Sequence, residues 1–336
     1  MTTRFLNEKE FISVDLINDF KYYKFDAEAA GKYYEYFAIR PNKSYDSVPL
    51  DSLIWSDTVE TQYCLLDNKC LLLKDKGDGE TPSGCLPFCT ESELPYYFKL
   101  QEKYFNQVLN VPFSAYYADS EGVEYLKSLG VLDNYDIKEE EDIFDYIYSG
   151  DALRTLSGRT LSKKRNCINK FIKKYDGRWE YKTLGYDDQY EIRDILDKWY
   201  KNKSTDGLGI DLGKNYDTDE TLKIEHTGIL KIFESKALLD KIKMGGIYVD
   251  NGLAALSIAS LNSSEQMAVL EIEKALPGYE GLYQLIKREF LSHEFPAAKI
   301  VNMEDDLGIE GLRRSKMSYK PCMFEKRYTI IQNDFK

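Results

Sequence analysis

One stretch of the sequence, residues 243–331, constrains the fold most, because strand and helix signals follow one another there in a regular order. It opens with two β-prone runs around Asp250-Asn251-Gly252, and Asn-Gly is the strongest short hairpin signal since both central residues tolerate positive φ. A strand at 266–275 follows, and the apolar spacing of 281–295 is helical. The order β-β-β-α-β-α-β is completed by a short strand at 299–303, a basic helix at 309–319 and a last strand at 323–331.

The amino-terminal half repeats this layout. A second turn, Asp67-Asn68, precedes Asp250-Asn251 by 183 residues (67 to 250), and the same offset aligns further elements with those of the second half: a helical run at 97–108, a strand at 114–117 and a helix at 121–129. Two copies of one α/β unit explain this pattern. The length of 336 residues also favours two domains over one core. We therefore expect an α/β protein with mixed sheets and helices, divided into a domain at 1–150 and a domain at 151–336 around a cleft.

Composition limits where such a protein works and what it binds. The amino terminus has no apolar signal-peptide segment, and no run reaches the roughly 18 apolar residues that a membrane-spanning helix needs. We expect a cytoplasmic protein without integral membrane contact. The formal charge of −12 opposes general attraction to nucleic acids or anionic membranes, although a local basic patch can override it.

Cysteine and histidine offer little metal or nucleophile chemistry. In the absence of a secretion signal, the six cysteines are expected to be reduced. Cys85 and Cys89 form a tight pair, but no second pair accompanies them, so we expect no metal site. Neither His226 nor His293 lies in a nucleophile–base pattern, so a serine or cysteine hydrolase triad is not supported.

A basic helix is predicted between the two units, at 157–175. Its apolar face consists of Leu161, Ile168, Phe171 and Ile172. Positive charge on this otherwise acidic chain is concentrated at Lys163, Lys164, Arg165, Lys170, Lys173 and Lys174. One interpretation is a solvated helix face. The other is a binding site for phosphate or an RNA backbone, in which Lys163, Lys164 and Arg165 hold a phosphate-bearing donor.

The connection between the strand at 266–275 and the next helix is a second candidate binding site. A glycine-containing turn before a helix places backbone N–H groups and a positive dipole end at one spot. Glycine lets a phosphate or carboxylate approach the backbone closely. A plain strand-to-helix connection is the alternative. On the binding interpretation, the donor or substrate contacts Glu273, Lys274, Gly278 and Gly281.

Charged residues crowd the segment after the strand at 299–303. Three consecutive acids, Glu304 to Asp306, precede a helix whose Arg313, Lys316 and Tyr319 recur at three-residue steps on one side. Carboxylates there can orient or deprotonate an amine, and the basic side chains can stabilise charge on an acyl oxygen or leaving group. A surface salt-bridge network, with Asp306 capping the helix, is the alternative. On the catalytic interpretation, the reacting groups are Glu304, Asp305, Arg313, Lys316 and Tyr319.

Three segments, 156–171, 271–283 and 301–321, resemble the C-terminal domain of phosphatidylglycerol lysyltransferases and their soluble bacterial relatives. That family is similar to the Fem-type peptidoglycan aminoacyltransferases, and the resemblance implies two tandem GNAT-like acyltransferase units. It also implies transfer of an aminoacyl group from aminoacyl-tRNA, or of another acyl group from a CoA thioester, to a small-molecule amine or hydroxyl acceptor. No tightly bound cofactor is implied. The same segments add Asn166, Tyr283 and Asn302 to the expected substrate-binding residues.

Donor and acceptor stay open, as does activity itself. The sequence does not include the membrane-embedded portion of the lysyltransferases, and we expect the segment 77–84 to form a mobile loop over the cleft. The leading hypothesis is a transferase in which positioning and oxyanion stabilisation supply most of the rate. The competing hypothesis is a non-catalytic module that keeps the fold and binds a small ligand. Turnover discriminates between them.

Overall fold

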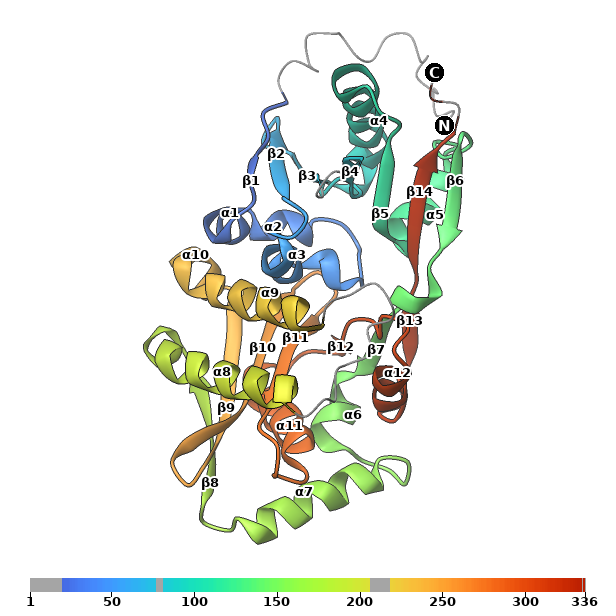
Figure 1. Ribbon diagram of the computed structural model, residues 1–336. Coiled ribbons are helices and arrows are strands. Elements are labelled where there is room, and N and C mark those ends of the chain that lie inside the picture. Colours follow the sequence, from blue (N-terminus) through green and yellow to red (C-terminus); the bar gives the residue numbers. More distant parts are fainter. Residues whose placement is uncertain (1–19, 77–80, 206–217, 334, 336) are drawn as a thin grey trace.

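Two seven-stranded mixed sheets form the framework of the protein, in a computed structural model that describes residues 20–76, 81–205, 218–333 and 335 (Figure 1). The first sheet has the spatial order β1 (Tyr23–Lys24), β2 (Gln62–Leu66), β3 (Cys70–Asp75), β4 (Ser83–Gly84), β5 (Ser114–Asp119), β14 (Arg327–Gln332) and β6 (Tyr135–Glu139). The second has the order β13 (Met323–Glu325), β7 (Asp145–Ser149), β12 (Ile300–Asn302), β11 (Met267–Ala275), β10 (Gly252–Asn262), β9 (Ile242–Val249) and β8 (Trp179–Leu184).

Each half of the chain contributes its last strand to the sheet of the other half (Figure 1). β14 pairs antiparallel with β5 and β6 of the first sheet, and β7 pairs antiparallel with β12 and β13 of the second. The offset of 183 residues carries β7 onto 328–332, which is almost all of β14. The exchange is therefore reciprocal, and the sheets hold the two halves together.

Most of the predicted elements are present. Both hairpin turns form, with positive φ at Asp67-Asn68 and at Asp250-Asn251. The predicted last strand at 323–331 is wrong as a single strand of the second unit, because the chain forms β13 and β14 in different sheets. Arg327 and Ile330 are fully buried within the first sheet, whereas Met323 lies exposed at the edge of the second. Of the predicted loop at 77–84, residues 77–80 lie outside the described residues, and Ser83–Gly84 is β4.

Helices cover the faces of both sheets (Figure 1). They are α1 (Ala27–Lys32), α2 (Tyr34–Phe37), α3 (Leu50–Trp55), α4 (Leu94–Tyr104), α5 (Ser120–Ser128), α6 (Gly150–Thr155), α7 (Ser162–Lys174), α8 (Gln189–Thr205), α9 (Thr218–Leu230), α10 (Lys236–Leu239), α11 (Leu282–Glu294) and α12 (Glu310–Met317). The predicted basic helix is α7, and the apolar stripe of α11 is buried as its spacing predicts. None of the helices in the described part of the chain has the length and apolar character needed to cross a membrane.

Three apolar cores fill the molecule. One lies between the first sheet and α4 and α5. A second lies between the second sheet and α6, α7 and α11. The third joins the opposite face of the second sheet to α8 and to α1, α2 and α3 of the first half. This shared core places residues of the first half, notably those of α3, against the second sheet.

Candidate active site

Two neighbouring parallel strands of the second sheet separate after three residue pairs. β11 pairs with β12 only through Met267–Val269, although β11 continues to Ala275. Beyond that point, the edge of β11 that faces β12 has no strand partner among the described residues. Ligands in open α/β sheets bind outside the carboxyl ends of the parallel strands. This divergence of β11 and β12 is therefore the candidate ligand-binding site.

Carboxylates from three elements converge at the divergence. Glu271 is the extra residue of a β-bulge in β11, because Ile258 of β10 faces Ile272 while the next residue faces Leu270. Glu304 follows β12 in the left-handed region, with φ 57°. Burial and then the charge of Asp51 raise the pKa of Glu304 well above its usual range. Burial also raises the pKa of Asp51, in α3, to about 8, with Asp46 and Asp305 contributing.

Neither carboxylate oxygen of the buried Glu271 accepts a hydrogen bond of standard geometry within the described chain, although Ser260 lies near enough to oppose the rise in its pKa. The hydroxyls of Ser257 and Ser260 in β10 are likewise buried and unpartnered. A buried polar group without a partner costs about 1–3 kcal/mol, so most such groups in native proteins are satisfied. Burial raises the pKa of Glu271 well above its usual range. A ligand that donates hydrogen bonds, such as an ammonium group, fits this arrangement.

Lys316 of α12 supplies positive charge next to these carboxylates. Its ammonium donates hydrogen bonds to the backbone carbonyls of Met303 and Asp305, which holds the lysine against the chain that leaves β12. Burial lowers the pKa of Lys316, and Glu304 and Asp305 oppose that shift. The charges of these two carboxylates therefore favour the charged form of the lysine.

A second lysine group lies on the α11 side of β11. Lys287 of α11 is buried, and its nearest carboxylate oxygen, Glu273 Oε2, is 3.5 Å away. The ring centroid of the buried Tyr319 lies 4.3 Å from the Lys287 ammonium and 4.1 Å from that of Lys164 in α7. Three separate elements thus bring two lysines to one tyrosine.

Asn302 ties the end of β12 to the exchanged strand β7. Its amide Nδ2 donates to Asp145 Oδ2 at 2.7 Å and to the carbonyl of Lys43 at 2.8 Å, and its Oδ1 accepts from the Glu304 backbone N–H at 2.7 Å. Burial raises the pKa of Asp145 to about 7, against the effect of Arg327 and Asn302. Asn302 is fully buried and positions Glu304.

Several residues predicted from the sequence thus lie in these two groups, around Lys316 and around Tyr319. They are Lys164, Glu273, Asn302, Glu304, Asp305, Lys316 and Tyr319.

Other predicted residues lie elsewhere. Arg313 is engaged by two carboxylates, with Nε 2.8 Å from Asp306 and Nη2 2.9 Å from Asp142, so its guanidinium stabilises the loop rather than facing the divergence. Arg165 donates to the carbonyls of Leu156 and Gly158 and closes the turn before α7. Two further predicted residues of α7, Lys163 and Asn166, are exposed.

Lys274 and Tyr283 lie toward α8 and α9. The Lys274 ammonium is 2.8 Å from Glu225 and 4.2 Å from the ring centroid of Trp199. The Trp199 indole N–H donates to the Tyr283 hydroxyl at 2.9 Å. This arrangement orders the helices against the end of β11, away from the Lys316 group.

The glycine turn before α11 packs against α7 at one of its two glycines. A Cβ at Gly281, whose φ is 92°, would lie 2.4 Å from the backbone oxygen of Cys167 in α7. The glycine therefore serves the close packing of α7 on the start of α11. Gly278, with φ 88°, has open space around it.

Asp51, Glu271 and Lys287 were not among the predicted site residues. Lys287 interrupts the apolar stripe of α11, and Glu271 interrupts an apolar strand, so both carried a signal in the sequence. Asp51 carried none, because only the packing of α3 against the second half, including α9, brings it here. No group of three metal-ligating side chains is found within the described ranges.

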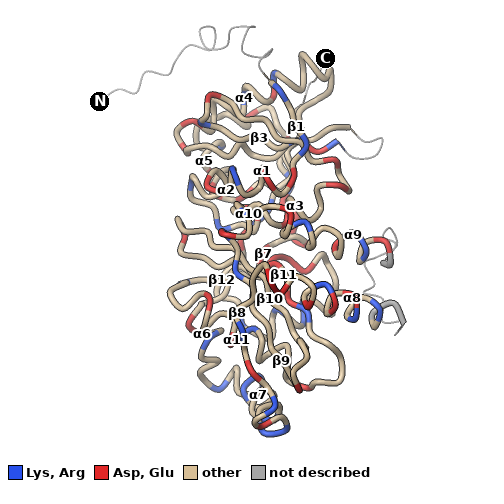
Figure 2. The backbone as a smooth tube through the Cα atoms, turned by 90° about the vertical axis from the view of Figure 1, so that its left-hand side faces the viewer, with Lys and Arg blue, Asp and Glu red and all other residues tan. Residues whose placement is uncertain are grey.

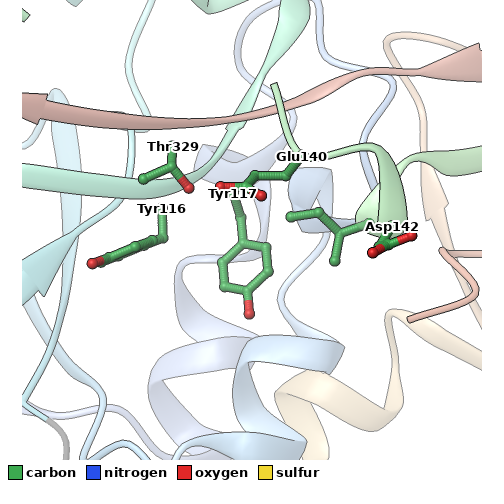
Figure 3. A pocket seen from close by; sticks show the side chains of 6 residues that line it. Tyr116, Tyr117, Glu140, Asp142 and Thr329 are labelled. Carbon is green, nitrogen blue, oxygen red and sulfur yellow. The ribbon is translucent and has the colours of Figure 1, made fainter. Parts of the chain in front are cut away.

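A shallow pocket of about 230 Å³ lies apart from this region, where β14 enters the first sheet. Figure 3 shows its lining, which consists of Tyr116, Tyr117, Glu140, Asp142, Ile143 and Thr329. None of the predicted site residues contributes to it.

Comparisons with known proteins agree with this architecture. A conserved protein of unknown function from Bacteroides thetaiotaomicron superposes with a TM-score of 0.76 at 21% identity, covering 94% of this chain and all of that one. L-PGS from Bacillus licheniformis gives 0.62 at 13% identity, covering 90% and 91%. FemX gives 0.56 at 7% identity, covering 93% and 98%. The fold is thus the GNAT-like and Fem-type fold that the resemblance implied.

Sequence comparison gives the family. An uncharacterised protein of Mycoplasmoides gallisepticum is 23% identical over 210 residues, which are 62% of this chain and 61% of that protein. The family model described as phosphatidylglycerol lysyltransferase, C-terminal, matches residues 52–331, most of the sequence. The chain therefore belongs to the phosphatidylglycerol lysyltransferase C-terminal family.

Proposed function

We propose that this protein is an aminoacyltransferase that moves an aminoacyl group from an activated donor to an amine or hydroxyl of a small acceptor. The observation that carries the proposal is the pair of unpartnered, buried oxygens of Glu271 at the divergence of β11 and β12. An aminoacyl group brings an ammonium that donates to such oxygens, and a bound ammonium would favour ionisation of the neighbouring carboxyls of Asp51 and Glu304, whose pKa values are raised without it. A lysyl group, which carries two ammoniums, suits several carboxylates.

Lys316 is placed to stabilise the negative charge that develops on the carbonyl oxygen of the donor. Attack by the acceptor breaks the bond from the acyl carbon to the donor oxygen or sulfur, and the electron pair of that bond leaves with the donor. A positive charge fixed beside the carbonyl in a partly dry site lowers the barrier without reorganisation. Its hydrogen bonds to two carbonyls hold the ammonium in place.

Glu304 or Asp305 takes the proton from the acceptor as the new bond forms and returns it to the leaving group. The pKa of both carboxyls is raised, first by burial, which makes each a stronger base than a solvated carboxylate. The backbone N–H of Glu304, bonded to Asn302, fixes the position of this residue. The ring of Tyr319 packs against Lys164 and Lys287 and orders these two side chains.

The donor is an aminoacyl-tRNA or a CoA thioester, and no tightly bound cofactor takes part. The names of relatives indicate a lysyl donor and a lipid acceptor. For this chain we propose only an aminoacyl donor and do not propose a lipid acceptor. Work in the cytoplasm is part of the same proposal, since charged tRNAs and CoA thioesters are found there.

Transfer assays with purified protein test the proposal. Lysyl-tRNA is incubated with a set of small amines and polyols, and product is followed by mass spectrometry. Lys316→Met and Glu304→Gln should each lower kcat about 10²–10³-fold, as expected for groups that stabilise charge or move a proton. Glu310→Gln, in the same helix region but exposed, is the control and should keep full activity.

Two results would count against this function. Full activity of both variants, with unchanged unfolding temperatures, would remove these residues from the reaction. Binding of aminoacyl compounds without any turnover, whichever charged tRNA or CoA thioester is supplied, would favour the non-catalytic module instead.

A further inference from the structure

The pocket where β14 enters the first sheet is built on a β-bulge. The register of β5 against β14 shifts there, so that Tyr116 and Tyr117 together oppose the single residue Thr329. Consecutive side chains of a regular strand lie on opposite faces of the sheet, whereas all three of these residues line the pocket. The bulge therefore directs two neighbouring tyrosines into one space, and Figure 3 shows their rings on the same side of the strand.

Tyr117 has a backbone conformation that does not suit a tyrosine. Its φ of 55° lies in the left-handed region, where glycine and asparagine are favoured and a bulky residue is an outlier. Arg327 accounts for the backbone, because its guanidinium donates to the Tyr117 carbonyl from Nε at 3.1 Å and from Nη2 at 2.7 Å. An asparagine would present the same carbonyl with less strain. We therefore look to the pocket for the role of the ring, which is 49% exposed.

Two carboxylates form the acidic side of the pocket. Glu140 and Asp142 line it and belong to a run of four consecutive acids, 139–142. Glu140 Oε2 accepts a hydrogen bond from Lys138, and Asp142 Oδ1 accepts one from Arg313, both at 2.9 Å. The second oxygen of each carboxylate accepts no hydrogen bond from the described residues. Each carboxylate therefore retains an acceptor for a further donor.

The bases that contact this acidic run do not fill the pocket. Lys138 and Lys326 are exposed, and exposed ion pairs contribute little to stability. Arg313 divides its charge between Asp142 and Asp306. None of these three basic side chains lines the pocket. The space between the rings and the carboxylates therefore contains no cation from the described part of the chain.

We propose that this pocket binds the primary ammonium of a small organic amine, at a site separate from the carboxylates of β11 and β12. Tyrosine rings attract cations through their quadrupole, and aromatic cages recognise ammonium groups in this way. The N–H groups of the ammonium donate to Glu140 Oε1 and Asp142 Oδ2 in charge-assisted hydrogen bonds. A volume of about 230 Å³ has room for the ammonium and a short alkyl chain. Binding here does not depend on the proposed transfer reaction.

Calorimetric titration of the full chain with putrescine, a primary diammonium with a short alkyl chain, tests the site. At about 0.15 M salt, attraction by the net charge of −12 is screened beyond about 8 Å. 1,4-Butanediol has a similar length without the charge and should not bind. Tetramethylammonium has the charge without N–H donors and should bind at least about 5-fold more weakly than putrescine.

Variants of the acidic side separate the pocket from general attraction to the acidic run. Glu140→Gln and Asp142→Asn should each weaken putrescine binding at least about 5-fold, because each removes a charged acceptor. Glu141→Gln removes the same charge from the same run. Glu141 is exposed and does not line the pocket, so this control should change the affinity less than about 2-fold.

Variants of the aromatic side test the ring. Tyr117→Asn removes the ring but keeps a residue that tolerates positive φ, so it should weaken putrescine binding at least about 3-fold without lowering the unfolding temperature. Tyr117→Phe keeps the ring and should bind within about 2-fold of the wild type. Tyr190→Asn, at an exposed tyrosine of α8, is the control and should leave the affinity unchanged.

Several outcomes would overturn the site, whatever the result of the transfer assays. They are an absence of putrescine binding at millimolar concentration, equal binding of tetramethylammonium, and equal losses in Glu140→Gln and Glu141→Gln. Full affinity in Tyr117→Asn would remove the ring from the site. Binding that falls in the pocket variants and persists in the two controls supports the site, even where no transfer is detected.

Discussion

The ends of β5 and β12 occupy the same place in the two halves, since the offset of 183 residues carries Asp119 onto Asn302. In the first half, Asp119 is a buried carboxylate whose two oxygens both accept hydrogen bonds. Arg40 Nη1 donates to it at 2.7 Å and the Gly122 N–H at 2.8 Å. Burial alone would raise the pKa of Asp119, but Arg40 and the Gly122 N–H lower it. In the second half the strand ends in a neutral amide, and both carboxylate oxygens of Glu271, on the neighbouring strand β11, lack such partners.

The neighbouring strands differ in the same way. In the first sheet, β4 meets β5 at a single pair, Gly84 with Ala115, and side chains fill the space beyond it. A Cβ on Gly84 would lie 2.5 Å from the Gln101 amide and 3.2 Å from Phe113. In the second sheet, β11 and β12 diverge around unpartnered polar atoms. At these positions one copy of the unit is filled by packed side chains, and the other contains buried polar atoms without partners.

Removing Arg40 should produce the largest effect. Arg40→Met leaves Asp119 buried without its cation, and breaking a buried ion pair in this way costs about 3–5 kcal/mol of unfolding free energy. Urea unfolding followed by circular dichroism measures it. Arg40→Met combined with Asp119→Leu should recover a large part of the loss. A loss below about 1 kcal/mol in the single variant would show that Asp119 is not held as described.

Making the second half resemble the first should also destabilise the protein. Asn302→Asp removes the donor to Asp145 and places a second carboxylate beside it, without a counterpart of Arg40. The expected loss is about 2–3 kcal/mol at pH 8. Because the pKa of Asp145 is about 7 in the folded protein, its carboxyl protonates as the pH falls, so the loss should shrink below pH 7. A loss that is constant from pH 5 to pH 8 would contradict this origin.

Neutralising Glu271 should have a smaller effect of opposite sign. Its pKa is raised in the folded state, so above about pH 4.5 the unfolded chain has released a proton that the folded protein still binds, and the stability of the wild type falls as the pH rises. Glu271→Gln lacks this penalty and should be more stable by about 1–2 kcal/mol at pH 8. The difference should vanish near pH 4. Thermal unfolding across this range measures it, and a less stable variant at pH 8 would mean that Glu271 has a partner.

Local patterns predicted the elements that form these two regions. The Asn-containing turns, the apolar spacing of α11 and the basic helix α7 each depend on a few consecutive residues. The turns and α11 formed close to their predicted bounds, whereas α7 begins at Ser162 and not at residue 157. The cluster around Glu304 and Lys316 was also recognisable, because charges follow an apolar strand. Sequence patterns of this kind depend on residues close together along the chain, so they predict local structure well.

Contacts between distant segments were beyond such patterns. β7 and β14 each pair in the sheet of the other half, and such pairing depends on distant segments that no pattern of consecutive residues records. Asp51 reaches the site only through the packing of α3 across halves. Arg313 was assigned to the site because it shares a helix side with Lys316, but the carboxylates of Asp142 and Asp306 draw it away.

The smallest effect should come from the two hairpin turns, where the halves have stayed alike. Both central residues of each turn have positive φ, 54° and 52° at Asp67-Asn68 and 51° and 67° at Asp250-Asn251. Glycine adopts these angles without a Cβ penalty, although it gains freedom in the unfolded chain, so the two contributions nearly cancel. Asn68→Gly and Asn251→Gly should each change the unfolding free energy by less than about 0.5 kcal/mol.

The two turn variants should also agree with each other, because both asparagines are exposed and both turns have the same backbone geometry. Chemical denaturation of the two variants side by side measures the difference. Divergence between the halves would then be confined to the strand ends and the space beside them. A difference above about 1 kcal/mol in unfolding free energy between the variants would show instead that the two halves also differ at their turns. The difference between Asp119 and Asn302 would then be one of many between the halves.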